Sequence, residues 1–263
     1  FRKGYSTYKK SLFKNMKVII LAAGKGTRLR PLTNNKPKCM VELLGKPLIE
    51  HQLDVLKKYN INEIYVATGY LEDKIQFAEI KEKFFNPDFE STNMVVSLFK
   101  ALPVMEGDDL LITYGDIVYN EDVLEKVLED DSKIGVVVDQ KWRQYWEARM
   151  DDPLSDAETL KLNDLSNIIE LGKNAKTFND IEGQYIGMIK IRKDFVSKFI
   201  SYYNSLDRNE LYDGNDFENM YMTSFLQKIT EELMPLKPIF INNGWMEVDE
   251  PNDLNHTEFF IKK

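Results

Sequence analysis

The stretch that decides the fold is Leu21-Ala22-Ala23-Gly24-Lys25-Gly26-Thr27-Arg28-Leu29-Arg30-Pro31-Leu32-Thr33, which continues the apolar run of residues 18–23. An apolar run of this length is typical of a buried strand. The small residues after it let a ligand approach the backbone, the glycines permit positive φ, and successive N–H groups can cradle an anion. We therefore predict an anion-binding loop at the exit of the first strand.

A second cationic segment, Lys36-Pro37-Lys38, follows this loop. The loop is not a P-loop, because no Lys-Ser or Lys-Thr ends it, and it is not a dinucleotide fingerprint, because the third glycine is missing. Gly-x-Gly-Thr-Arg alone would also suit a tight turn between a strand and a helix. The full run with the two lysines favours a site for a phosphorylated nucleotide, with Arg28 and Lys38 as fixed positive charges.

Short apolar runs alternate with helical patterns through the first half of the chain. Strands are expected at residues 18–23, 64–68, 110–113 and 134–139, and helices at 48–58, 92–102 and 121–130. Ser91 or Thr92 is the expected cap of the helix at 92–102, and Asn120 of the helix at 121–130. This order predicts an α/β fold with a mostly parallel, Rossmann-like sheet flanked by helices.

The alternation loosens in the second half of the chain. Residues 142–191 suggest loops and short strands, at 168–171 and 184–191, without a strong helix. Helices are expected at 193–205, 217–232 and from 251, with a strand at 238–241. We interpret residues 16–263 as a single domain that carries a smaller β-rich, acceptor-binding lobe at about 140–192. Residues 1–15, which are basic and aromatic, are interpreted as an N-terminal extension, linker or tag.

Composition excludes several classes of protein. The net charge of -8 comes without a basic block, so a nucleic-acid partner is not expected. The longest apolar run, residues 18–23, is too short for membrane insertion. Cys39 is the single cysteine, so an intramolecular disulfide and a cysteine-based zinc site are excluded and a cytoplasmic protein is expected. The oligomeric state stays open, with a homodimer as one option.

Two acidic positions stand out from the other charges. The strand at 110–113 leads into Tyr114-Gly115-Asp116, which places Asp116 at the carboxyl end of a parallel strand, where open α/β sheets bind ligands. Near the C-terminus, Trp245, Glu247 and Asp249 alternate and share one face of a strand. Two such carboxylates together with a triphosphate would form a magnesium site.

The run from Leu21 to Thr33, followed by Lys-Pro-Lys, resembles the signature of the nucleotidyltransferases of sugar-1-phosphate and phosphocholine type. It matches L-A-A-G-x-G-[ST]-R-L-x-P-L-T at every fixed position. The resemblance implies that the loop binds the nucleotide, that Arg28 and Lys38 contact its phosphates, and that Asp116 and Asp249 hold Mg²⁺. The loop residues implied are Leu21, Ala22, Ala23, Gly24, Lys25, Gly26 and Thr27.

Weaker matches are closer to the cytidylyltransferase branch of that family, which includes phosphocholine, 2-aminoethylphosphonate and phosphoglutamine enzymes. They lie at residues 69–70, 91–98, 115–119 and 217–220. This resemblance implies CTP and a small phosphorylated acceptor as partners, Gly69 and Asn93 as further nucleotide-binding residues, and a role in decorating cell-surface polysaccharide or lipid. The alternative within the family is a sugar-1-phosphate nucleotidyltransferase that makes an NDP-sugar.

Candidate acceptor-binding residues come from the second half of the chain. Trp142 and Trp146 are one helical turn apart and, with Tyr185, could stack on a cationic choline or ammonium group, or else belong to the core. Glu218 and Asn219 could bind an amine or amide, or else cap a helix and face solvent. A catalytically silent module of the same fold is disfavoured, because the four charged residues of the site are all present.

Overall fold

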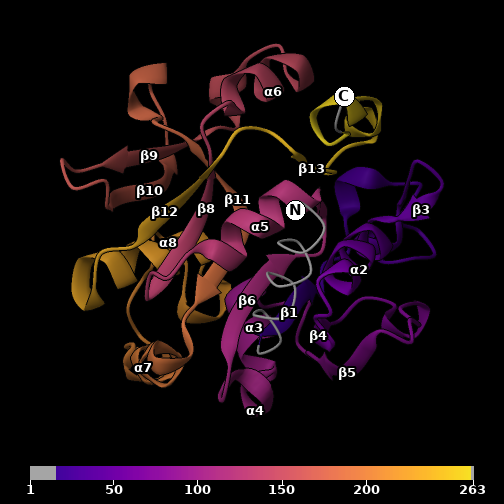
Figure 1. The fold of residues 1–263 in the computed structure, drawn as a ribbon, viewed down its shortest axis with the longest axis horizontal. Coiled ribbons are helices and arrows are strands. Elements are labelled where there is room, and N and C mark those ends of the chain that lie inside the picture. The colour runs from indigo at the N-terminus through magenta and orange to yellow at the C-terminus, as the bar shows by residue number, and fades with distance from the viewer. Residues whose placement is uncertain (1–15, 262–263) are drawn as a thin grey trace, which may run out of the picture.

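The computed structural model describes residues 16–261, so the N-terminal extension predicted at residues 1–15 lies outside the described part. A seven-stranded sheet runs through the molecule in the order β12–β8–β11–β6–β1–β4–β5 (Figure 1). Its strands are β1 (Met16–Ala22), β4 (Glu63–Thr68), β5 (Ile80–Phe85), β6 (Asp109–Tyr114), β8 (Ile134–Asp139), β11 (Gln184–Ile191) and β12 (Lys237–Ile241).

Strand β1 lies inside the sheet, and both of its faces are buried. It pairs in parallel with β4 and β6, while β4–β5 and β12–β8 are also parallel pairs. Strand β11 alone is antiparallel to its neighbours β6 and β8 within this sheet. The predicted α/β fold with a mostly parallel sheet is therefore confirmed.

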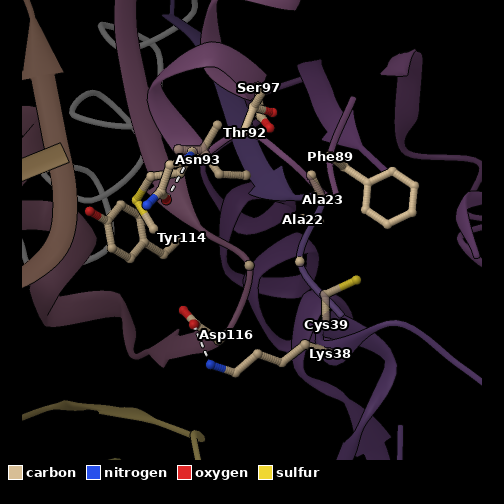
Figure 2. Close-up of a pocket in the computed structure, with 14 residues that line it drawn as sticks. Ala22, Ala23, Lys38, Cys39, Phe89, Thr92, Asn93, Ser97, Tyr114 and Asp116 are labelled. Carbon is tan, nitrogen blue, oxygen red and sulfur yellow. Dashed lines mark hydrogen bonds and ion pairs between the residues drawn. The ribbon is translucent and has the colours of Figure 1, made fainter. Parts of the chain in front are cut away.

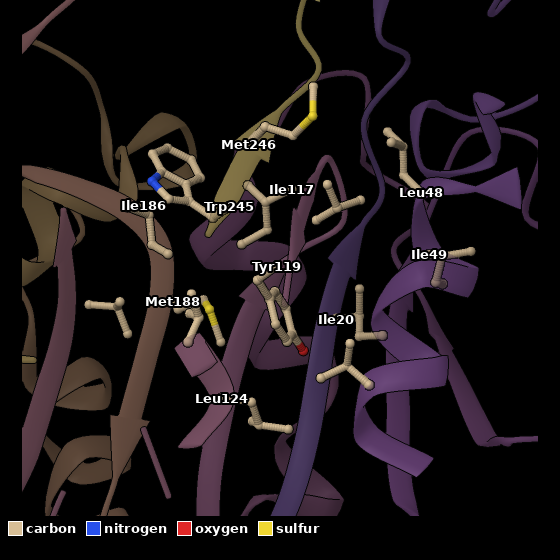
Figure 3. Close-up of a cluster of buried hydrophobic side chains, with 14 of the residues drawn as sticks. Ile20, Leu48, Ile49, Ile117, Tyr119, Leu124, Ile186, Met188, Trp245 and Met246 are labelled. Carbon is tan, nitrogen blue, oxygen red and sulfur yellow. The ribbon is translucent and has the colours of Figure 1, made fainter. Parts of the chain in front are cut away.

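Helices cover both faces of the sheet. Ile20 of β1 packs into the core that contains α2 (Leu48–Lys58) and α5 (Glu121–Glu129), part of which Figure 3 shows. Ile19 faces the opposite core, to which four helices contribute: α3 (Met94–Lys100), α4 (Leu102–Met105), α7 (Lys193–Ser205) and α8 (Met222–Lys228). The alternation of β1 thus serves two layers of helices, which explains why every residue from Val18 to Ala22 is buried.

Smaller elements complete the fold. The short strand pairs are β2 (Glu42–Leu43) with β3 (Lys46–Pro47), β7 (Ile117–Tyr119) with β13 (Trp245–Glu247), and β9 (Glu158–Leu162) with β10 (Ile168–Asn174). The 3-10 turns are η1 (Thr27–Leu29), η2 (Lys38–Met40), η3 (Glu72–Lys74), η4 (Pro153–Ser155), η5 (Phe178–Asp180), η6 (Phe217–Asn219), η8 (Pro251–Asn255) and η9 (Thr257–Phe259), and η7 (Ile229–Leu233) is a π-helical turn.

Three predicted helices differ from those observed. The helix expected at 92–102 begins at Met94 and is capped by Asn93, whose side chain accepts from the Met94 N–H at 2.7 Å. Thr92 does not cap it, because its hydroxyl donates to the Asp88 carbonyl instead. The helix expected at 217–232 is divided, since Asp216 closes η6 as a separate turn before α8 begins. The final helix is only the short turn η8.

The prediction that residues 142–191 lack a strong helix is wrong. Helix α6 (Trp142–Arg149) is present, and it buries Trp142, Tyr145, Trp146 and Arg149. These positions follow helical spacing, so the signal was in the sequence and was misread. The lobe ends earlier than the predicted residue 192, because β11 belongs to the main sheet rather than to the lobe.

None of the helices within residues 16–261 has the length and apolar composition that crossing a membrane requires.

The topology gathers the functional segments at one edge of the sheet. Strands β1, β4, β6, β8 and β12 all run toward that edge, and the antiparallel β11 begins there. Loops that leave parallel strands at a common edge are where such sheets bind ligands. The glycine-rich loop after β1 and Asp116 after β6 therefore lie side by side.

Candidate active site

A cavity of about 150 Å³ opens at the carboxyl edge of β1 and β6 (Figure 2). Four residues of the predicted loop line it, from Leu21 to Gly24, together with Lys38 and Asp116. The remaining lining residues are Cys39, Phe89, Thr92, Asn93, Met94, Ser97, Tyr114 and Gly115. The structure therefore brings the loop, the second lysine of Lys-Pro-Lys and one of the two predicted acids to one cavity.

Gly26 lets the loop fold back toward Lys38. It adopts a left-handed conformation, with φ 61°, and a Cβ at this position would lie 3.0 Å from the Lys38 Cβ. The buried Thr33 hydroxyl donates to the Gly26 carbonyl at 2.7 Å and closes the loop. Glycine is therefore required here both for backbone conformation and for the close approach of Lys38.

Gly115 brings Asp116 beside the loop. The Gly115 N–H donates to the Leu21 carbonyl at 2.8 Å, and a Cβ on Gly115 would lie 2.7 Å from that oxygen. A side chain at Gly115 would thus push the end of β6 away from β1. This contact sets Asp116 at the mouth of the cavity.

Lys38 joins the two predicted acids. Its Nζ donates to Asp116 Oδ2 at 2.6 Å and also to Asp249 Oδ1. Asp249 Oδ1 in addition pairs with an Arg28 guanidinium nitrogen at 3.1 Å. Four charges that are far apart in the sequence therefore form one balanced cluster.

The pKa values of Lys38 and Asp249 reflect this pairing. Burial alone would lower the pKa of the Lys38 ammonium, but the charges of Asp116 and Asp249 outweigh it and raise the pKa above its ordinary value. Burial would raise the pKa of Asp249, but Lys38 and then Arg28 outweigh it and lower the pKa. Both side chains are therefore ionised at neutral pH.

Cys39 lines the same cavity, but its thiol is not a reactive nucleophile. Burial raises the pKa of its thiol to about 12, so the nucleophilic thiolate is not formed at neutral pH.

The two acids offer oxygen ligands that suit a magnesium ion. Asp116 Oδ1 is buried and has no hydrogen-bond partner among the described residues. Within residues 16–261 there is no group of three or more Asp, Glu, His or Cys side chains that could enclose a metal. Magnesium commonly uses one or two carboxylates and completes its coordination with substrate phosphates and water. Asp116 and Asp249 fit that pattern.

A second cavity, of about 210 Å³, adjoins the first, because Met94 and Tyr114 line both. It has acidic and aromatic walls. Its other lining residues are Trp146, Asp156, Glu158, Gln184, Tyr185, Ile186, Gly187, Tyr221, Met222, Thr223, Glu247 and Asp249. Lys38 therefore bonds one acid from each cavity, Asp116 from the first and Asp249 from the second.

Two glutamates in the second cavity have raised pKa values. Glu158 keeps an exposed surface, yet crowding by protein atoms and the nearby charges of Asp156 and Asp213 raise its pKa to about 7. Desolvation also raises the pKa of Glu247, although Arg149, with which the Glu247 carboxylate is paired, opposes this shift. A cationic group in this cavity would stabilise the ionised form of both.

Of the predicted acceptor-binding residues, Trp146 and Tyr185 reach the second cavity. Trp146 is oriented by its indole N–H, which donates to Asp156 Oδ2 at 3.0 Å. Trp142 does not reach the cavity, because it is buried in the core against Trp146 and Phe178. Its assignment as an acceptor-binding residue is therefore corrected.

Glu218 and Asn219 are likewise corrected. They lie on η6, outside the residues that line either cavity, with the Glu218 side chain exposed and the Asn219 amide bonded to Asp216. Their backbone has a supporting role, since the Glu218 carbonyl accepts from the Asn93 N–H at 2.8 Å. These two residues were predicted at the start of a long helix, but they belong to the separate turn η6.

Four of the predicted nucleotide-binding residues lie beside the first cavity rather than in its lining: Lys25, Gly26, Thr27 and Gly69. Lys25 points to Glu90, with which it pairs at 2.7 Å. Gly69 supports the loop, since Tyr70 N–H donates to the Ala23 carbonyl at 3.1 Å. Asn93 does line the cavity, although its side-chain oxygen is also the cap of α3.

Met94, Tyr114 and Glu158 line the cavities, although the predicted site did not include them. Tyr114 directly precedes Gly115-Asp116, so its position at the end of β6 was a usable signal. Met94 follows the cap of α3, and Glu158 begins β9 in the lobe. Neither carries a local pattern, because only the tertiary fold brings them to the site.

Comparison with known proteins identifies relatives of this arrangement. Residues 18–167 match the family described as the MobA-like NTP transferase domain. The CTP:phosphoglutamine cytidylyltransferase of Campylobacter jejuni is 44% identical over 91% of this chain and 98% of its own length. The choline-phosphate cytidylyltransferase of Streptococcus pneumoniae is 39% identical over 48% of this chain and 65% of its own length.

Solved structures show the same fold at lower identity. The inositol-1-phosphate CTP transferase from T. maritima superposes with a TM-score of 0.73 at 21% identity, over 94% of both chains. The CTP:phosphocholine cytidylyltransferase from Streptococcus pneumoniae gives 0.67 at 23% identity, over 94% of this chain and all of that one. At such identities the likeness concerns the fold alone.

Replacing Lys38 by methionine is predicted to change how stability depends on pH. A carboxylate with a lowered pKa stabilises the fold above its unfolded pKa, and this contribution is lost as the pH falls through the folded value. K38M removes most of that contribution from Asp249. The melting temperature of K38M should therefore lie below that of the wild type at pH 7. The difference should narrow only as the pH falls below the unfolded pKa of 3.8 toward the lower folded pKa of Asp249, as thermal unfolding from neutral pH to below that value will measure.

The control for K38M is Lys36→Met, which removes an ammonium that pairs only loosely with Glu42, at 3.6 Å on the surface. The difference in melting temperature between K36M and the wild type should stay nearly constant across the same pH range. If the difference in melting temperature between K38M and the wild type does not narrow on acidification, the pairing of Lys38 with Asp249 is contradicted.

Gly69→Ala is predicted to destabilise the fold by about 1–3 kcal/mol, as overpacking does. Its Cβ would lie 2.7 Å from both the Ala23 carbonyl oxygen and the Phe89 Cβ. Urea denaturation measures the loss. In Gly24→Ala the new methyl meets nothing within 4 Å, so this variant should unfold with nearly wild-type stability. Equal losses in the two variants would show that Gly69 does not pack against the loop.

Proposed function

This chain belongs to the family of MobA-like NTP transferase domains, and from that premise we propose that it transfers CMP from CTP to a small phosphorylated acceptor, with release of pyrophosphate. The observation that carries the proposal is the bridge made by Lys38. Its ammonium bonds Asp116 at the mouth of the first cavity and Asp249 in the second. The charged cluster thus lies where a nucleotide in one cavity would meet an acceptor in the other.

The first cavity suits the nucleotide. Its wall from Ala22 to Gly24 has only small side chains or none, which leaves the backbone open to a base and its phosphates. Lys38 lines this cavity and Arg28 belongs to the same charge cluster, so their positive charges can bind the phosphates of CTP. Asn93 and Ser97 add polar groups to the same wall.

Transfer then requires one bond to form and one to break. A phosphate oxygen of the acceptor attacks the α-phosphorus of CTP, and the bond to the bridging oxygen of pyrophosphate breaks. Lys38 and Arg28 stabilise the charge that develops on the phosphate oxygens, and no covalent enzyme intermediate is needed. We propose that Asp116 and Asp249 hold Mg²⁺, which would offset further negative charge on the triphosphate.

CTP is the proposed nucleotide because the two relatives described above are cytidylyltransferases by name. The acceptor is proposed from the chemistry of the second cavity. Its carboxylates, including Glu158 and Glu247, and its aromatic rings, including Trp146 and Tyr185, suit a cationic ammonium group better than a neutral sugar. We therefore propose a phosphorylated amino compound, of which phosphoglutamine, phosphocholine and aminoalkylphosphonates are candidates.

The cellular setting is a further proposal. A single cysteine fits a reducing compartment, so we propose that the enzyme acts in the cytoplasm. We propose that its product serves the decoration of cell-surface polysaccharide or lipid, as the resemblance to the cytidylyltransferase branch implies.

A substrate panel tests the proposed function. Pyrophosphate release is measured for CTP, UTP, dTTP and GTP, each against phosphoglutamine, phosphocholine, aminoethylphosphonate and glucose-1-phosphate. Turnover should require CTP and an amino acceptor, because the second cavity is acidic and aromatic. Turnover only with glucose-1-phosphate would instead establish the sugar-nucleotide alternative.

Asp116→Asn is predicted to lower kcat on the order of 10²–10³-fold, the loss expected when a group that stabilises charge in the transition state is removed. The amide keeps the size of the carboxylate, so the thermal transition should change little. Single-turnover kinetics with CTP and Mg²⁺ measure the effect. Asp151→Asn, on the exposed segment after α6, is the control. A kcat near the wild-type value in D116N would exclude Asp116 as a metal ligand.

A further inference from the structure

Helix α6 ends in a buried arginine that no step of the proposed transfer uses. The Arg149 side chain is only 1% exposed, and its guanidinium lies over the rings of Tyr145 and Trp146, at 4.9 and 5.4 Å from their centroids. A buried cation needs compensating charge, since the loss of hydration is otherwise costly. Arg149 finds that charge in two carboxylates, Asp253 and Glu247.

The first carboxylate connects Arg149 to Asp249. Arg149 Nε donates to Asp253 Oδ1 at 2.8 Å, and a terminal nitrogen reaches Asp253 Oδ2 at 3.3 Å. Asp253 Oδ2 in turn accepts from the backbone N–H groups of Asp249 and Glu250, at 2.7 and 2.8 Å. The peptide that carries the Asp249 side chain is therefore fixed by a carboxylate that Arg149 orients.

The second carboxylate connects α6 to the strand just before Asp249. Arg149 also bonds the side chain of Glu247, the last residue of β13. The Tyr145 hydroxyl donates to the Glu247 carbonyl and accepts from the Glu247 N–H, both at 3.0 Å. The backbone is thus held on both sides of the turn on which Asp249 lies.

From these contacts we infer that Arg149 is a positioning residue for the transfer reaction, which sets Asp249 opposite Asp116 through Asp253 and Glu247. The inference rests on the proposed function, because Asp249 matters to turnover only if it belongs to the reacting site. Arg149 itself does not touch Lys38, Arg28 or Asp116 in the described hydrogen bonds and ion pairs. Its hydrogen bonds reach the Asp249 backbone through Asp253, and its positive charge also acts on the Asp249 carboxylate.

Arg149→Met tests this inference, because methionine keeps much of the length and none of the charge. We expect kcat to fall by about 10–100-fold, as is usual when a group that orients a metal ligand is lost. The KM for CTP should change by less than about threefold, since the loop from Leu21 to Gly24 is not touched. Mn²⁺ affinity of the protein–CTP complex, measured by electron paramagnetic resonance, should weaken by a comparable factor.

Two further variants separate positioning from general loss of structure. Arg149→Lys, which keeps the charge, should recover part of the Mn²⁺ affinity. Arg143→Met on the exposed side of α6 removes an arginine that pairs with Glu147, and it should leave kcat and Mn²⁺ affinity at the wild-type level. If R149M has no cooperative thermal transition, Asp253→Asn breaks the same ion pair without changing volume and should show the same selective loss.

A double-mutant cycle decides whether the effect passes through Asp249. In the Asp249→Asn background, R149M should weaken Mn²⁺ binding little further, because the group that it positions has already lost its charge. If R149M and D249N each weaken Mn²⁺ binding by independent factors that multiply in the double variant, the inference is overturned. Wild-type kcat and Mn²⁺ affinity in both R149M and D253N would also overturn it. If the wild-type chain releases no pyrophosphate with any pair in the substrate panel, the proposed function is wrong, and the inference is overturned with it.

Discussion

The ion pairs of Lys38 with Asp116 and Asp249 are the interactions on which the site depends. Neither carboxylate is fully exposed, and two such anions side by side would repel each other without a cation between them. Lys38 follows the glycine-rich loop, Asp116 follows β6, and Asp249 follows β13. A single ammonium thereby ties the nucleotide loop to both acids, so that the loop, the sheet edge and the C-terminal segment form one unit.

The sheet makes this convergence possible, and the antiparallel strand β11 is part of the reason. Because β11 runs against its neighbours, it begins at the edge where they end, and its first residues, Gln184 and Tyr185, line the second cavity. The lobe is inserted between the end of β8 and the start of β11. An insertion between those two points must emerge at the carboxyl edge of the parallel strands, which places the lobe beside the glycine-rich loop.

Local signals in the sequence were sufficient for much of this arrangement. The apolar run of β1 and the helical pattern of α2 are both visible in adjacent residues, and the structure has a buried strand and a helix at these places. The glycine-rich loop is equally local, and its first residues line the first cavity. The bonding of Asp116 and Asp249 to one lysine also agrees with the expectation that the two acids meet. The metal itself stays a prediction.

What failed depended on tertiary contacts. Helix α6 was missed because its tryptophans were weighed as ligand-binding residues of a loop-rich lobe, whereas Trp142 packs in the core. The cap of α3 was misassigned because the Thr92 hydroxyl donates to the Asp88 carbonyl, a contact that helix-capping propensities do not reveal.

The two cavities differ in how far a local sequence pattern reveals them. Residues 21–24, which are adjacent in the sequence, form part of the first cavity, whereas side chains from separate elements form the second. A contiguous motif can therefore reveal the first cavity, whereas the second is lined by scattered residues such as Glu158 and Trp146. On the proposed function, Asp249 joins this acidic cavity to the cations Lys38 and Arg28, so charge would favour an acceptor with a phosphate at one end and an ammonium at the other.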